Sequence, residues 1–127
     1  MPLVRIALPR STTAEQRRAI SDGVHQALVE MFKIPVDDRF QIITEHGPGV
    51  EIVRPRTYLG IEYSDALIII QITANDTRTT EQKKALYKDI AARLTQHAGL
   101  RPQDIVINLV EVKKENWSFG NGEATYA

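Results

Sequence analysis

The chain has 127 residues, with 16 Lys plus Arg balanced by 16 Asp plus Glu and no Cys. This length predicts one domain over residues 1–127 with a real hydrophobic core. The zero net charge, and the lack of any apolar run near the ~20 residues of a membrane span, argue against nucleic acid and membranes as partners. No signal-peptide pattern is seen, and the three His stand apart, so we expect a cytoplasmic protein that acts on a small molecule without metal or other cofactor.

The first half of the chain predicts a strand, a helix and a second strand. A strand-like run covers residues 2–8. Thr13 and Gln16 then form a capping box, which satisfies backbone N–H groups at a helix start. An apolar stripe at helical spacing follows: Ile20, Val24, Ala27, Leu28 and Met31. The second strand is expected at residues 39–45.

The middle of the chain has no helix pattern. It opens with the turn Gly47-Pro48-Gly49. We expect residues 50–53 and 58–62 to pair as a short hairpin around a turn at residues 54–57.

The second half repeats the first at an offset of 66 residues, so that residues 2–45 correspond approximately to residues 66–111. Thr79 and Gln82 repeat the capping box. Strands are expected at residues 66–73 and 105–112, and the first of these is nearly continuous in branched aliphatic residues, a pattern that suits burial on both faces. The apolar stripe of the second helix consists of Leu86, Ile90 and Leu94.

Two β-α-β units with right-handed crossovers predict an α+β fold. The expected architecture is a four-stranded mixed sheet with both helices on one face, plus the short hairpin. We expect Phe40, Ile42, Ile69 and Leu109 on the other face. Because an open apolar face needs a cover, this arrangement predicts an oligomer.

Pro2 is the most informative residue of the chain. If Met1 is removed, Pro2 becomes a free secondary amine, a group that no side chain provides. An α-amino group titrates near pKa ~8, and an apolar pocket lowers that pKa by disfavouring the charged form. Such an amine can carry a proton near neutral pH or act as a fixed cation. The alternative is a proline that merely begins an edge strand, and a retained Met1 would make its nitrogen an inert amide.

Four motifs give the sequence a recognisable resemblance. They are Pro2-Leu3, the run from Ile34 to Gln41 that includes Asp37-Asp38-Arg39-Phe40, Arg78 directly before Thr79, and Trp117-Ser118-Phe119-Gly120. With the repeat and the length, they make the chain similar to the tautomerase superfamily, and within it to the malonate semialdehyde decarboxylase-like group. The resemblance implies a homotrimer with an active site near each amino-terminal proline.

The resemblance also implies roles for single residues. Pro2 corresponds to the catalytic proline, and Asp38 to the aspartate beside it. Arg78 corresponds to an arginine that binds the substrate carboxylate, while Trp117 and Phe119 correspond to aromatic residues of the pocket wall.

One departure from the family pattern concerns the substrate carboxylate. The decarboxylases resembled here have a second arginine two positions before the equivalent of Arg78, and this chain has Asp76 there. Arg54 or Arg56, in the expected hairpin turn, are candidates to replace that cation as substrate-binding residues.

Structural alternatives remain open for these residues. Asp38 has a twin at Asp104 in the repeat, so both could be turn residues that begin a strand. Arg78 could be a surface residue, although a cation at a helix start opposes the helix dipole. Trp117 and Phe119 could serve packing, or could anchor the tail onto a neighbouring subunit.

The expected function is enzymatic chemistry of Pro2 on small oxo acids. A Pro2 amine kept protonated by Asp38 favours decarboxylation or hydration, because an ammonium group polarises a carbonyl. A neutral Pro2 favours keto–enol tautomerisation of a 2-oxo acid such as phenylpyruvate. A non-catalytic trimeric binding module and a ferredoxin-like ligand-sensing domain are the alternatives, since a fold does not fix a function.

Overall fold

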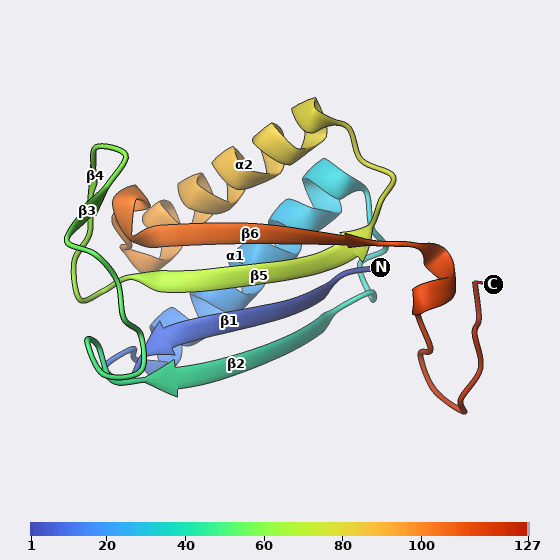
Figure 1. Cartoon of the computed structure of the whole chain (residues 1–127), viewed down its shortest axis with the longest axis horizontal. Coiled ribbons are helices and arrows are strands. Elements are labelled where there is room, and N and C mark those ends of the chain that lie inside the picture. Colours follow the sequence, from blue (N-terminus) through green and yellow to red (C-terminus); the bar gives the residue numbers. More distant parts are fainter. Residues whose placement is uncertain (127) are drawn as a thin grey trace.

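The computed structural model describes residues 1–126, which form one layer of strands and one layer of helices (Figure 1). In chain order the helices and strands are β1 (Leu3–Pro9), α1 (Ala14–Phe32), β2 (Phe40–His46), β3 (Thr57–Tyr58), β4 (Ile61–Glu62), β5 (Ile68–Asn75), α2 (Thr80–Ala98) and β6 (Ile105–Val112). The main sheet has the order β2-β1-β5-β6. Its outer pairs are parallel and the central β1–β5 pair is antiparallel, so the predicted mixed sheet is confirmed.

The sequence repeat is also a repeat of structure. Both helices have 19 residues, and α2 begins 66 positions after α1. Each begins with the predicted capping box: the Thr13 side chain accepts a hydrogen bond from the Gln16 backbone, and Thr79 does the same for Gln82. The two β-α-β units therefore start their helices in the same way.

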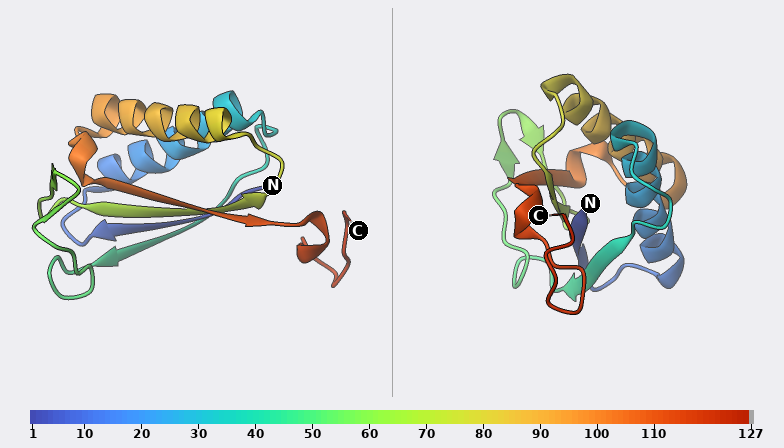
Figure 2. Two further views of the ribbon diagram at one scale, coloured as in Figure 1. Left: turned by 45° about the horizontal axis from the view of Figure 1, so that its top comes forward. Right: turned by 90° about the vertical axis from the view of Figure 1, so that its right-hand side faces the viewer.

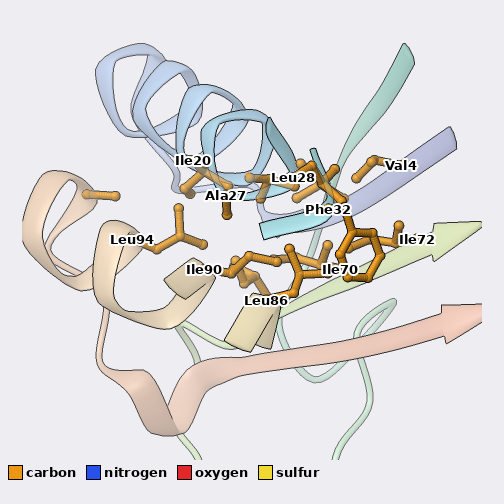
Figure 3. Packing of buried hydrophobic residues seen from close by; sticks show 14 of the residues in the cluster. Val4, Ile20, Ala27, Leu28, Phe32, Ile70, Ile72, Leu86, Ile90 and Leu94 are labelled. Atoms are coloured by element: carbon orange, nitrogen blue, oxygen red, sulfur yellow. The ribbon is translucent and has the colours of Figure 1, made fainter. Parts of the chain in front are cut away.

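Both helices cover the same face of the sheet (Figure 2). The core between the layers consists of alternate strand residues and one stripe from each helix, as Figure 3 shows for Val4, Ile70, Ile72, Ile20, Leu28, Leu86, Ile90 and Leu94. Burying one such side chain contributes roughly 1.5–3 kcal/mol. The helices approach closely at Gly23, where a Cβ atom would lie 2.8 Å from Cδ2 of Leu94. This contact explains the glycine inside α1.

The other face of the sheet is open in the single chain. Phe40, Ile42 and Ile69 lie on it as expected, with 48%, 41% and 36% of their surface exposed. Leu109 was expected there and the expectation is wrong, because the alternation along β6 turns Leu109 toward the helices and Val110 outward. The exposure of Ile69 also shows that β5 is buried on only one face within one chain.

The hairpin lies further along the chain than expected. Its strands are β3 and β4, and its turn is formed by Leu59 and Gly60, both with positive φ (51° and 78°), instead of residues 54–57. Two left-handed residues match the twist of paired strands in a two-residue loop. Residues 47–52 instead fold on themselves, with the Gly47 carbonyl accepting hydrogen bonds from the backbone of the residues that follow.

The amino terminus and the carboxyl-terminal segment lie at one end of the sheet, and the β3–β4 hairpin lies at the opposite end (Figure 1). Within residues 1–126, no helix is both long and apolar enough to span a bilayer.

Candidate active site

A cavity of about 200 Å³ opens where β1 begins and the carboxyl-terminal segment crosses the end of the sheet. Pro2 is buried there. The cavity is lined by Met1, Pro2, Leu3, Phe40, Trp117, Ser118 and Phe119. Three of the residues predicted for the site, Pro2, Trp117 and Phe119, are therefore brought together from the two ends of the chain.

Asp38 reaches this site from the loop between α1 and β2. The loop is held by His25, whose buried ring nitrogen Nε2 lies 2.7 Å from the Val36 carbonyl, and by the Asp38 backbone N–H, which donates to Pro35. The Asp38 oxygen Oδ2 lies 3.8 Å from the amino-terminal nitrogen, which Met1 carries in this structure. The other oxygen, Oδ1, is buried and has no hydrogen-bond partner within residues 1–126.

The twin of Asp38 in the repeat has a different environment. Asp104 is fully buried and accepts hydrogen bonds from the Ser64 backbone and hydroxyl, at 2.8 and 2.6 Å, and from Arg101. Its oxygens are satisfied, which is the pattern of a structural carboxylate. Asp38 keeps a buried oxygen unsatisfied at a cost of about 1–3 kcal/mol, and such an exception is a reason to look for a ligand.

Arg78 lies in the loop between β5 and α2. Its Nη2 donates a hydrogen bond of 2.8 Å to the Phe32 carbonyl, and its guanidinium lies 4.8 Å from the centre of the Phe32 ring. The last turn of α1 has no basic residue of its own. Arg78 therefore places a cation at the carboxyl end of α1, where the helix dipole favours it.

The three charged groups of the site influence one another. Burial lowers the pKa of the amino-terminal ammonium group from its ordinary value of 8.0; the Asp38 carboxylate opposes this shift, and the charge of Arg78 adds to it. Burial also lowers the pKa of Arg78, again opposed by Asp38. The amine therefore gives up its proton more readily than an exposed amino terminus does.

Aromatic rings form the wall of the cavity. Trp117 stacks on Phe119 with 5.5 Å between ring centres, and Phe119 lies 6.5 Å from Phe40. Tyr126 meets Phe119 edge-on at 5.2 Å. The Trp117 indole N–H donates a hydrogen bond of 2.7 Å to Oδ1 of Asn75 at the end of β5.

Sequence reasoning did not assign Phe40, Tyr126 or Asn75 to the site. Phe40 lay inside a quoted motif, directly after Arg39, and its place at the start of a strand next to β1 was the available signal. For Asn75 the signal was a polar residue that ends an otherwise apolar strand.

Arg54 and Arg56 are not brought to this cavity within one chain. Both lie in the segment that leads into β3, and the β3–β4 hairpin is at the end of the sheet opposite the amino terminus (Figure 1). Arg54 pairs with Asp65 at 3.0 Å and lines a separate cavity of about 350 Å³, and Arg56 pairs with Glu62 at 3.2 Å.

No group of three or more His, Asp or Glu that could hold a metal ion is found within residues 1–126. The cavity offers instead an amino terminus and aromatic rings, and a carboxylate and a guanidinium act on that amino terminus from close by. This set can bind a carboxylate, hold or move one proton and surround a small organic molecule.

Two family models described as tautomerase enzyme match the chain, one over residues 38–120 and the other over residues 2–55. The chain is 40% identical over 124 residues to the Bacillus subtilis (strain 168) protein named "Probable tautomerase YusQ", a match that covers 98% of this chain and 97% of the relative.

Solved structures agree with this match. A malonate semialdehyde decarboxylase inhibited by 3-bromopropiolate has a TM-score of 0.91 and 40% identity, with 98% of this chain and 93% of the other covered. A second malonate semialdehyde decarboxylase, described with decarboxylase and hydratase activities, has a TM-score of 0.88 and 32% identity, with 98% and 95% covered. A fused 4-OT protein described as a symmetric trimer shares the fold alone, at a TM-score of 0.79 and 19% identity, with 98% and 97% covered. The chain belongs to the tautomerase superfamily of enzymes.

Proposed function

We propose that the protein decarboxylates small 3-oxo acids of the malonate semialdehyde type or hydrates small unsaturated acids, using the amine of Pro2 after removal of Met1. The observation that carries this proposal is the half-buried Asp38 carboxylate, which lies 3.8 Å from the amino-terminal nitrogen of Met1 and has one buried oxygen without a partner among the described residues. A carboxylate this close favours a charged amine over a neutral one. The similarity to two malonate semialdehyde decarboxylases supports the same substrate class.

In the proposed decarboxylation, Arg78 binds the substrate carboxylate through charge-assisted hydrogen bonds. The Pro2 ammonium donates a hydrogen bond to the 3-oxo oxygen and gives it a proton as the bond between C1 and C2 breaks. Carbon dioxide leaves, and the electron pair of the broken bond forms the enol. The enol then takes a solvent proton at C2 and returns its hydroxyl proton to Pro2, so that malonate semialdehyde yields acetaldehyde.

In the proposed hydration, the free oxygen Oδ1 of Asp38 accepts a hydrogen bond from a water molecule. The water adds its oxygen to the β-carbon of an unsaturated acid and passes a proton to Asp38. The ammonium of Pro2 supplies the second proton to the α-carbon. The aromatic wall of Trp117 and Phe119 excludes other water from this step.

A second candidate is keto–enol tautomerisation of a 2-oxo acid with Pro2 as a neutral base. Burial lowers the pKa of the amino-terminal amine, which Met1 carries in this structure. The same burial of a Pro2 amine would favour this reaction, because a neutral amine can take a proton from the carbon beside a carbonyl. The curated relative named as a probable tautomerase supports the same reaction.

We propose a homotrimer as the active form. The open sheet face exposes Phe40, Ile42 and Ile69, and burying such a face against other copies is favourable. In a trimer, Arg54 or Arg56 of a neighbouring subunit is the candidate for the second cation that binds the carboxylate.

The test is turnover of two substrates by one preparation. Intact mass first establishes that Met1 is gone. We then expect acetaldehyde from malonate semialdehyde at a higher kcat/KM than enol formation from phenylpyruvate, with both strongly reduced in Pro2→Ala. Faster turnover of phenylpyruvate would favour the tautomerase, and turnover of neither would favour a binding module.

A further inference from the structure

We propose that Asn75 is a positioning residue that holds Trp117 in the aromatic wall and thereby sets the width of the substrate cavity. The kinetic part of this inference rests on the proposed function, because it concerns which oxo acids the same site accepts. The structural part, that one side chain fixes the place of the wall, does not depend on any activity.

The tail, residues 113–126, makes one hydrogen bond to the main sheet within the described part of the chain, and this is the bond between Trp117 and Asn75. An indole N–H can only donate, so Trp117 needs an acceptor, and Oδ1 of Asn75 accepts at 2.7 Å. Among the described residues, the other hydrogen bonds of the tail after Val112 join tail residues to one another, such as Asn116 to Lys113 and Glu123 to Gly120. Asn75 is only 8% exposed, so its amide is held firmly by the end of the sheet.

Ring stacking makes the positions of Phe119 and Phe40 depend on that of Trp117. Trp117 and Phe119 are nearly parallel, with 18° between their planes, and Phe119 continues the stack toward Phe40 on β2. Each such contact contributes about 0.5–1.5 kcal/mol beyond its buried area. A Trp117 ring that loses its hydrogen bond is free to turn, and Phe119 then loses the ring that it packs against.

The same hydrogen bond attaches the aromatic wall close in sequence to Arg78. Asn75 is the last residue of β5, and Arg78 follows three positions later in the loop that β5 leads into. The Asn75–Trp117 contact therefore attaches the aromatic wall to the end of β5 from which the loop with Arg78 begins.

The chain has a single Trp and four Tyr, so fluorescence excited at wavelengths that tyrosine does not absorb, and the long-wavelength tryptophan bands of the near-ultraviolet circular dichroism, report on Trp117 alone. We expect Asn75→Leu, which keeps the size of the side chain and removes the acceptor, to shift the emission of Trp117 to longer wavelength and to weaken its near-ultraviolet signal. Asn75→Asp keeps an acceptor oxygen and should preserve both signals. Asn75→Ala serves as a second truncation if a leucine side chain disturbs the fold, with the far-ultraviolet spectrum as the check.

The kinetic arm uses a malonate semialdehyde assay. Removing one hydrogen bond should raise KM on the order of 3- to 10-fold, with a smaller change in kcat, because the wall binds substrate without touching the reacting atoms. In a Trp117→Phe background the donor is already absent, so Asn75→Leu should change KM no further.

Two results would overturn the inference. One is an unchanged Trp117 spectrum in a folded Asn75→Leu or Asn75→Ala protein. The other is the same rise in KM from Asn75→Leu with and without the indole, which would mean that Asn75 acts independently of Trp117. If no 3-oxo acid is turned over, the proposed function fails, and the spectra still decide the structural part.

Discussion

Arg78, two positions before the helix of the second repeat, donates a hydrogen bond of 2.8 Å to the carbonyl of Phe32, the last residue of the helix in the first repeat. One guanidinium thus joins the two halves of the chain, and its charge helps to lower the pKa of the amino-terminal amine, which Met1 carries in this structure. A substitution of Arg78 therefore changes the fold and the proposed chemistry together. The two effects have to be separated by the choice of variants.

Arg78→Lys is the variant that separates them. Lysine keeps a cation near the carboxyl end of α1, worth about 0.3–1 kcal/mol there, but it lacks the planar fork that binds a carboxylate through two hydrogen bonds. We expect a small loss of stability and a fall in kcat/KM of about ten- to a hundred-fold, as for a lost charge-assisted contact of ~1.5–3 kcal/mol. Urea unfolding and steady-state kinetics measure the two effects. Equal activity of Arg78→Lys and wild type would exclude the carboxylate role.

The sheet and helices could be predicted because their signals are local. Each capping box lies within four consecutive residues, and the repeat supplied every element twice. The side of the sheet on which Leu109 lies depends on the exact register of β6, and a shift by one residue reverses it. The hairpin was misplaced because Val50 and Val53 look like strand residues, yet both are about three-quarters exposed and gain no burial from pairing.

Only those site residues that the family resemblance implied could be predicted from the sequence. Pro2, Asp38, Arg78, Trp117 and Phe119 were assigned from motifs, and the structure gathers them at one end of the sheet. Contacts between distant segments have no local signal, which is why the Asn75–Trp117 bond, across 42 positions, was missed.

The twin aspartates allow a matched test of structure against function. Asp104→Asn removes a charge that accepts from Ser64 and Arg101 in the core, and we expect it to destabilise the fold by about 1–3 kcal/mol. Asp38→Asn replaces a carboxylate whose Oδ1 is unsatisfied and should leave stability unchanged or raised while activity falls, as is common at functional sites. Thermal unfolding of both variants is the measurement. A larger loss of stability in Asp38→Asn than in Asp104→Asn would contradict a functional role for Asp38.

The open face predicts how the protein assembles. A charge at Ile69, in the middle of this face, should break the proposed trimer, since a buried unpaired charge is costly. We expect Ile69→Glu to sediment as a smaller species than wild type at the same concentration. Ala85→Glu, on an exposed position of α2, introduces the same charge away from the face and is the control. A monomeric wild type, or equal sedimentation of both variants, would argue against assembly through this face.

We expect activity to require removal of Met1, because only then does Pro2 carry a free amine. With Met1 retained, the Pro2 nitrogen is an amide and has no proton to give or take. We expect intact mass to show loss of one methionine in active protein, and a variant that keeps Met1 to be inactive although folded. Full activity in protein that retains Met1 would exclude Pro2 as the catalytic group.

Stability should also report the state of the amine. With Met1 retained, burial lowers the pKa of the Met1 amine in the folded chain below its ordinary value of 8.0. The unfolded chain therefore binds the proton more tightly, and protonation favours unfolding. The free energy of unfolding should therefore rise with pH between the pKa of this amine in the folded chain and its ordinary value of 8.0. Above that pH the amine should contribute no further change. Urea unfolding across that window, compared with a protein acetylated at its amino terminus, isolates the contribution.

The pH dependence of activity separates the two proposed reactions. If the ammonium form of Pro2 polarises the substrate carbonyl, kcat/KM for a 3-oxo acid falls as pH rises through the pKa of that amine. Asp38→Asn removes the carboxylate that supports the charged amine, so its falling limb should move to lower pH. Asp37→Asn makes the same change at an exposed neighbour and should leave the profile in place.

If the neutral amine is the active form, tautomerisation of phenylpyruvate rises through the same pH range, and Asp38→Asn extends that activity toward lower pH. A rising profile that Asp38→Asn does not shift would mean that Asp38 does not control the amine at all, and the decarboxylase proposal would then lose the observation on which it stands.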